Sequence, residues 1–223
     1  MHELSLADIT NMILLDKVHF YKFLNGDTSI LDFEKQIYSN RNWERQLGED
    51  LYFELINFDF KDKNSTIRIR EFILNNIVEV GEFETWKLKT ILTEFLSDVL
   101  NMPGYLDKFY DLYCGTYQEN GIRKFRYKFL GNLGLNCFFW KDEDYLKYYY
   151  GENWKFENER ISDDLEFYHK QLKPFGEVIL DALNKRDIQI DNDGTYTIAD
   201  KLRDSLESEK IIVLEHPERK NVS

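Results

Sequence analysis

The sequence predicts a mainly α-helical protein, a multi-helix bundle with a small β-hairpin or strand element toward the end of the chain. Apolar residues recur every three or four positions over most of its length, which is the spacing of amphipathic helices. Only three of the 223 residues are prolines, so long stretches are free of helix breakers. Hydrophobic residues make up 43% and aromatic residues 16%, so the chain is expected to fold around a core.

The first hundred residues read as a series of short amphipathic helices separated by polar or glycine-containing breaks. Asp27, Thr28 or Ser29 can cap the second helix, Ser65 is expected to cap the fifth, and Gly81 to end it. The predicted helices span 4–24, 30–38, 43–47, 49–58, 65–80 and 83–101.

After Asn101-Met102-Pro103-Gly104, the clearest stop in the chain, the pattern is less regular. A helix is expected over 105–117, and residues 125–140 fit either helix or strand. Asp142-Glu143-Asp144 should cap a helix that Gly151 breaks. Two further helices are expected over 161–172 and 175–183, with Pro174 in the first turn of the second.

Alternating residues at 188–190 and 196–198, joined by Asp191-Asn192-Asp193-Gly194, predict a β-hairpin. A helix over 200–206 and a strand over 211–214 should follow. The turn also matches part of a calcium loop, with ligand positions at Asp191, Asp193 and Asp200. Gln189 stands where that loop needs a carboxylate, and the hairpin explains the same residues, so no metal is expected.

We therefore expect three regions packed as one globular unit. They are an N-terminal helical module over 1–102, an aromatic-rich helical region over 103–186 and a small α/β tail over 187–216.

The formal net charge is −12, from 29 basic and 41 acidic residues. A field of this sign repels nucleic acids and anionic membranes and attracts basic surfaces, although plain solubility also accounts for it. Cys114 and Cys137 form no C-x-x-C pair, which fits a reducing compartment. With no signal-peptide pattern and no apolar run near 20 residues, the expected location is the cytoplasm, without membrane contact.

Catalytic patterns are missing from the sequence, so we expect no enzyme activity and no cofactor. It contains no G-x-G-x-x-G, G-x-x-x-x-G-K, H-E-x-x-H or G-x-S-x-G motif. The histidines stand apart from any local catalytic partner; they are His2, His19, His169 and His216. An enzyme whose site assembles only in the fold is the alternative.

Arg123 to Lys128 is the one basic run, and its basic residues alternate with aromatics. Such a run could bind single-stranded nucleic acid. In a chain this acidic, a solvated face or a partner for the chain's own carboxylates explains it better, so nucleic acid is not the expected ligand. A regulatory nucleic-acid module is a further alternative.

Residues 137–154 combine tyrosine, tryptophan and phenylalanine with carboxylates. Tyr and Trp are favoured at protein interfaces, and carboxylates at a rim steer a basic partner. Most of these aromatics could equally form the core. We predict an acidic, tyrosine-rich partner-binding face made of Asp142, Glu143, Asp144, Tyr145, Tyr148, Tyr149, Glu152, Glu157, Asp163 and Asp164.

One part of the chain resembles a known family. The residues that show the resemblance are Ser29-Ile30-Leu31-Asp32-Phe33-Glu34, Ile37-Tyr38-Ser39-Asn40, Leu47-Gly48-Glu49-Asp50-Leu51-Tyr52-Phe53-Glu54-Leu55-Ile56 and Asp59-Phe60-Lys61-Asp62-Lys63. Over residues 20–80 the chain resembles the N-terminal helical module of small bacterial proteins that are encoded near toxins and regarded as immunity proteins. It differs in Gln36, where that pattern often has an aromatic, and in continuing for about 140 more residues.

The resemblance implies a cytosolic inhibitor that binds a toxin domain. Such inhibitors are often acidic when the toxin is a basic nuclease, which fits the net charge of −12. The family offers no catalytic residues to transfer. We expect an immunity-type inhibitory protein that neutralises a cognate, basic toxin domain.

Overall fold

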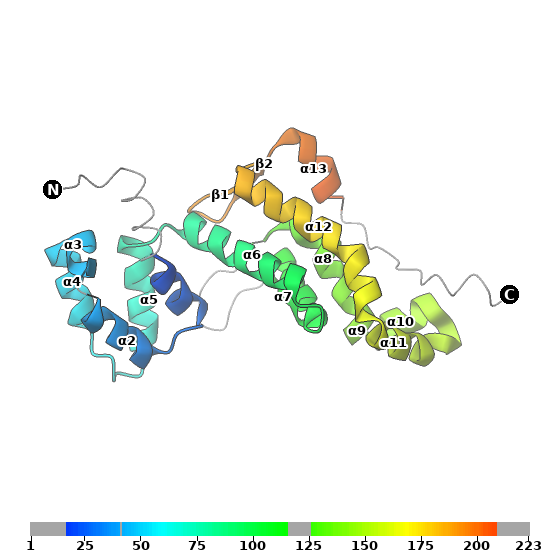
Figure 1. Ribbon diagram of the computed structural model, residues 1–223, viewed down its shortest axis with the longest axis horizontal. Helices are drawn as coiled ribbons and strands as arrows, with labels where there is room; N and C mark the ends of the chain where they lie inside the picture. The colour runs from blue at the N-terminus through cyan, green and yellow to red at the C-terminus, as the bar shows by residue number, and fades with distance from the viewer. Residues whose placement is uncertain (1–16, 41, 116–125, 209–223) are drawn as a thin grey trace. The chain divides into compact units, whose positions relative to one another are not determined.

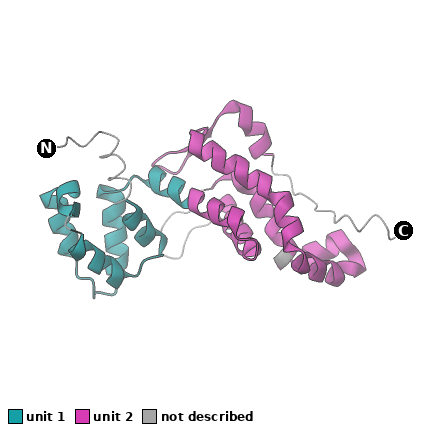
Figure 2. Ribbon diagram, in the orientation of Figure 1, with its two compact units in different colours: residues 1–87 teal, residues 88–223 magenta. Residues whose placement is uncertain are grey.

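The computed structural model describes residues 17–40, 42–115 and 126–208 (Figure 1). The chain divides into two compact units, residues 1–87 and 88–223, and each has its own buried core (Figure 2). Helices dominate both units, and the second contains a two-stranded antiparallel sheet. This confirms the predicted mainly helical fold with a small β-hairpin.

Unit 1 begins, in the described part, with a helical stretch at residues 17–25. Its remaining helices are α2 (Ile30–Ser39), α3 (Asn42–Leu47), α4 (Glu49–Ile56), α5 (Ser65–Asn76) and the first part of α6 (Val80–Ser97). Ser29 caps α2, because its hydroxyl accepts a hydrogen bond from the Asp32 amide at 3.1 Å. Gly48 adopts a φ of 83° between α3 and α4, a conformation that favours glycine.

The expected roles of Ser65 and Gly81 are wrong. Ser65 is the buried first residue of α5, and its hydroxyl donates to the Asp62 carbonyl. The helix ends at Asn76, because the chain turns there to place Val78, only 3% exposed, in the core. Gly81 lies in the first turn of α6 instead.

Aromatic stacking holds the core of unit 1 together. The rings of Phe23 and Phe33 stack with centroids 4.1 Å apart, and those of Phe20 and Trp43 with centroids 4.6 Å apart. The Arg70 guanidinium lies 5.8 Å from the Phe23 ring centroid and donates to the Phe23 carbonyl at 3.4 Å. Burying each such ring contributes about 2–3 kcal/mol.

Unit 2 contains the rest of α6 and a longer series of elements. They are α7 (Met102–Cys114), η1 (Lys128–Leu130), α8 (Gly131–Gly134), η2 (Leu135–Cys137), α9 (Phe138–Lys141), α10 (Glu143–Tyr150), η3 (Gly151–Asn153), α11 (Trp154–Asp163), α12 (Leu165–Lys185), β1 (Ile188–Ile190), β2 (Tyr196–Ile198) and α13 (Asp200–Leu206). Residues 128–141, which include most of the stretch 125–140 that fits either helix or strand, form short 3₁₀ and α turns.

The division into compact units falls between Lys87 and Leu88, inside α6. The sequence predicts the first regional boundary between residues 102 and 103. The chain does turn there, but Pro103 sits in the first turn of α7, where its missing N–H costs nothing. Leu92 and Met102, on either side of that turn, are buried in the same core, which joins the two helices.

Two glycines allow helices of unit 2 to approach closely. A Cβ at Gly134 would lie 2.7 Å from the backbone nitrogen of Tyr110, so α8 touches the backbone of α7. A Cβ at Gly176 would lie 2.9 Å from the Phe95 ring, where α12 meets α6. These contacts position α12 and the helices that precede it.

Helix α12 runs without a break through Pro174, so the prediction of two separate helices is wrong. Proline removes one hydrogen bond inside a helix. Tyr168 and Leu172 before it, and Ile179 and Leu183 after it, are all buried. Packing on both sides of Pro174 thus holds the helix continuous.

The predicted hairpin is present, with Ile188 paired to Ile198 and Ile190 to Tyr196. Both residues of the first of these pairs are buried, so the hairpin covers part of the core of unit 2. Helix α13 follows, as predicted. The strand expected over 211–214 lies outside the described residues.

Candidate protein-binding site on helices α10 and α11

Local sequence signals build α10 and α11 as two consecutive helices that pack on each other, here called the α10–α11 pair (residues 142–164). Asp142 caps α10, and its Oδ1 accepts from the Tyr145 amide at 2.9 Å. Glu143 and Asp144 occupy the first turn, where carboxylates complement the helix dipole. Gly151 ends α10 with a φ of 55°. Asp164 closes the segment by capping α12.

The inner side of the pair belongs to the core of unit 2. Leu146, Tyr150 and Ile161 are buried. The half-buried Tyr145 ring packs edge-on against Phe139 at 5.3 Å, and Tyr149 lies 4.6 Å from Tyr145. Burial, followed by the neighbouring Tyr149 hydroxyl, raises the pKa of Tyr145 above its ordinary value. Tyr145, and in part Tyr149, therefore belongs to the core, as the alternative interpretation of the aromatic segment predicts.

Glu157, which we predicted to contact a partner, faces inward and is only 8% exposed. Its carboxylate lies 3.7 Å from the Arg160 guanidinium, one helical turn away. A buried carboxylate requires such a partner, because desolvating a lone charge is costly. Glu157 is thus a structural residue of α11, and its place in the predicted face is corrected.

The outer side of the pair presents two large aromatic side chains to solvent. Tyr148 is 84% exposed and Phe156 is 64% exposed. Asp144 lies one turn before Tyr148 on α10, and Glu159 lies one turn after Phe156 on α11. The other exposed carboxylates of the predicted face are Glu143, Glu152 and Asp163.

Basic residues near this outer side are already engaged. Residues 142–166 hold nine acidic and three basic residues, which is half of the net charge of the chain. The Lys147 ammonium is 2.6 Å from the Glu143 carboxylate and 5.4 Å from the Trp154 ring centroid, and Lys155 also lies over that ring at 5.5 Å. The excess of carboxylates over cations leaves a negative field around Tyr148 and Phe156.

Sequence reasoning missed Phe156. The inward residues of α11 recur at Trp154, Glu157 and Ile161, and Phe156 lies off that stripe. The helical period could have identified it as an exposed aromatic residue.

A second polar site is a pocket of about 240 Å³ lined by Lys128, Tyr196, Ile198, Arg203 and Glu207. The Tyr196 hydroxyl donates to Glu207 Oε1 at 2.6 Å, and Arg203 donates to the Ile198 carbonyl at 3.3 Å. Burial and Glu207 together raise the pKa of Tyr196. These groups fasten α13 to the hairpin.

The two described histidines and the hairpin residue Asp193 take local structural roles. His169 Nε2 bonds the Phe95 carbonyl, and His19 lies beside Trp43, whereas His2 and His216 lie outside the described part. Asp193 accepts bonds from the Thr195 amide and hydroxyl at 2.9 and 2.7 Å, as a turn residue does. No group of three or more His, Cys, Asp or Glu side chains in the described ranges is arranged to hold a metal ion.

Of the basic run, only Arg126, Tyr127 and Lys128 are described. Arg126 lies over the Tyr113 ring at 5.7 Å, and Tyr127 is fully buried. This part of the run therefore packs within unit 2.

Within the described residues, no helix has the length and apolar character needed to cross a membrane. Comparisons with protein-family models, with curated proteins and with solved structures find no significant match to this chain.

Proposed function

We propose that the protein is an immunity-type inhibitor that binds and neutralises a basic toxin domain through the α10–α11 pair. The observation that carries this proposal is the exposure of Tyr148 and Phe156 on a segment, residues 142–166, that holds nine acidic and three basic residues. Exposed tyrosines and phenylalanines become anchors when a partner covers them, because a rigid ring supplies a large contact area at a low entropic cost.

Charge supports a basic partner. Surrounding carboxylates raise the rate of encounter with a positively charged surface and disfavour acidic ones. Glu143 is paired with Lys147, and the other exposed carboxylates on α10, η3 and α11 are Asp144, Glu152, Glu159 and Asp163. Leu146 is buried in the core of unit 2, so the pair is held in place before a partner binds. This supports the same conclusion, because a preordered surface loses less entropy on binding.

The resemblance of residues 20–80 to toxin-immunity proteins supplies the class of partner. Those residues fall within unit 1, whereas the α10–α11 pair lies in unit 2. Under this proposal unit 2 provides the acidic surface that the shorter proteins lack. The protein would act in the cytoplasm of the cell that makes the toxin.

Co-expression tests the proposal. Each candidate toxin domain encoded by a neighbouring gene is expressed in a bacterial host with and without the full-length chain, and survival is measured. Protection and a one-to-one complex on gel filtration are expected. Toxicity unaffected by the chain, with no complex formed, would refute the proposal.

Neutralising substitutions test the role of charge in the same assay. Asp144→Asn, Glu152→Gln and Asp163→Asn together should slow association about tenfold at low salt, because the electrostatic attraction is reduced. The control is Asp204→Asn on α13, an exposed carboxylate outside the pair. If the triple variant and the control associate at the same rate, the charge of the pair has no role.

A further inference from the structure

Unit 1 exposes a second group of large apolar side chains, separate from the α10–α11 pair. Leu31 and Tyr38 on α2 are each 56% exposed, and Phe53 on α4 is 62% exposed. Phe33, Ile37 and Leu55 fill the core from the same two helices. Unit 1 thus leaves more than half of each of these three side chains uncovered, and we call them the α2–α4 face.

Hydrogen bonds join the two helices that present these residues. Leu31 and Tyr38 are seven residues apart, so they share a side of α2. The Tyr38 hydroxyl donates to the Ile56 carbonyl on α4 at 3.2 Å, and the Tyr52 hydroxyl donates to the Ile37 carbonyl at 3.4 Å. Phe53 lies between Tyr52 and Ile56 on α4, so it is within one turn of each of these two hydrogen bonds.

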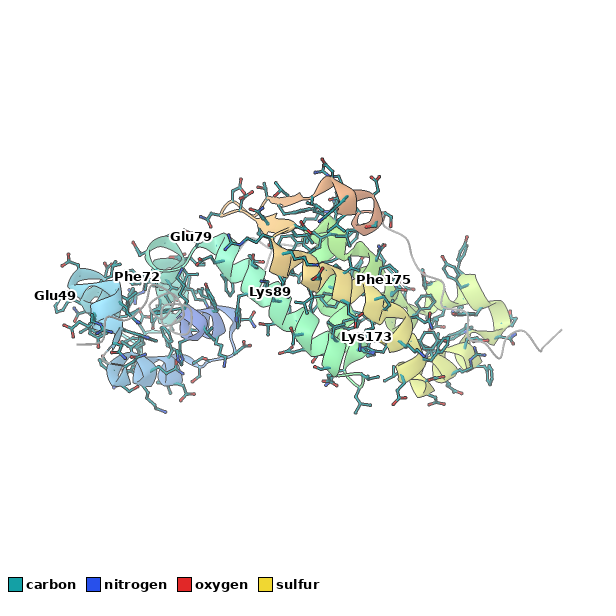
Figure 3. The ribbon with its side chains drawn as sticks, turned by 45° about the horizontal axis from the view of Figure 1, so that its top comes forward. Glu49, Phe72, Glu79, Lys89, Lys173 and Phe175 are labelled. Atoms are coloured by element: carbon teal, nitrogen blue, oxygen red, sulfur yellow. The ribbon has the colours of Figure 1, made fainter. Side chains whose placement is uncertain are left out.

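Carboxylates flank this face as they flank the α10–α11 pair. Glu49 and Asp50 lie one turn before Phe53 on α4, and all three are exposed. Glu49 is directed away from the helices of unit 1 (Figure 3). Residues 30–59 contain seven acidic and three basic residues, and one of the basic residues, Lys35, is paired with Asp32.

We propose that the α2–α4 face is a second docking surface, and that its occupant is a basic, amphipathic segment of a protein partner. The apolar side of that segment covers Leu31 and Phe53, and its cations meet the carboxylates beside them. The complementary charge identifies the occupant, because a second copy of this acidic chain would bring like charges together. Two surfaces of one chemistry give the protein two points of attachment, and linked sites gain avidity without new contacts.

A synthetic peptide can report on both surfaces without the natural partner. The probe is a helical peptide with leucines along one side and lysines along the other, titrated calorimetrically into the full-length chain at about 0.15 M salt, where screening is physiological. The variants are L31A/F53A for the α2–α4 face and Y148A/F156A for the α10–α11 pair. The controls are I67A and L100A, which remove exposed apolar side chains at other sites in the two units.

The wild-type chain and both controls should bind two peptides. Each double variant should bind one, with affinity at its altered site reduced at least tenfold. Two peptides on L31A/F53A would overturn the second surface. Loss of binding only in Y148A/F156A would also overturn it while leaving the proposed function standing. A dimer of the chain alone that L31A/F53A abolishes would assign the face to a second copy and equally overturn the proposal.

Discussion

His169 Nε2 lies 2.8 Å from the carbonyl oxygen of Phe95, and the two rings have centroids 5.2 Å apart with their planes tilted by 56°. The carbonyl belongs to the last turn of α6, where helix carbonyls lack partners within the helix. His169 lies on α12 and is only 6% exposed. This one side chain thus satisfies the end of α6 and joins it to α12, the longest helix described in unit 2.

Replacing His169 should destabilise the fold. His169→Ala leaves the Phe95 carbonyl without a donor and removes a buried ring, at a cost of about 2–3 kcal/mol in the free energy of unfolding. Urea denaturation measures that cost. The neighbouring Lys170→Ala is the control, because Lys170 is exposed. Equal stability of the two variants would show that the hydrogen bond has no structural role.

Substitution by alanine should have opposite effects on stability at Gly134, which lies against the Tyr110 backbone, and at Gly104, which has open space around it. Gly134→Ala places a methyl group 2.7 Å from the Tyr110 backbone and should destabilise the protein by about 1–3 kcal/mol or more, because backbone atoms must move. Gly104→Ala on α7 meets nothing within 4 Å and should stabilise it by about 0.5–1 kcal/mol. Thermal unfolding compares the two. A tolerated alanine at position 134 would contradict the described approach of α8 to α7.

The two cysteines should differ in reactivity. Burial, and then the negative charge of Asp107, raises the pKa of the Cys137 thiol to about 12. Cys114 is more exposed. Because the thiolate is the reactive species, iodoacetamide at about pH 8 should modify Cys114 well before Cys137. Mass spectrometry of the native protein gives the order, and faster labelling of Cys137 would show that its thiol is not shielded.

The raised pKa of Cys137 also predicts a pH dependence of stability. The thiol contributes fully below its unfolded pKa of about 8.5–9, and its contribution is lost as the pH rises toward about 12. This follows because the unfolded chain releases the proton first. Cys137→Ala should therefore lose less stability than the wild type between pH 8 and 11, whatever its stability at pH 8. Parallel losses in the two proteins would exclude this linkage.

Local signals made much of the helical pattern predictable. Ser29 and Asp142 both cap helices where the sequence suggests, and Gly151 ends α10 with the positive φ that glycine allows. These effects involve only a few neighbouring residues. The sequence therefore contains all the information needed to place them.

Tertiary contacts decided the features that sequence reasoning missed. Pro174 stays inside α12 because residues on both sides of it are buried, and residues 128–141 take short turns where Gly134 meets Tyr110. The same holds at the candidate site. The Glu157 carboxylate can be buried because the positive charge of Arg160, one turn away, compensates its negative charge. The Phe156 side chain, by contrast, remains exposed. Exposure depends on which side of α11 the rest of unit 2 covers.

The central claim is that Tyr148 and Phe156 anchor a basic protein partner. The affinity of the purified chain for the toxin domain against which it protects in co-expression, measured for the wild type and for Y148A/F156A, tests this claim most directly. Both side chains are exposed, so the Tm of the variant should stay within a few degrees of the wild-type value. The proposal predicts a loss of affinity of at least tenfold, mainly through faster dissociation. An unchanged affinity for the folded variant would contradict it.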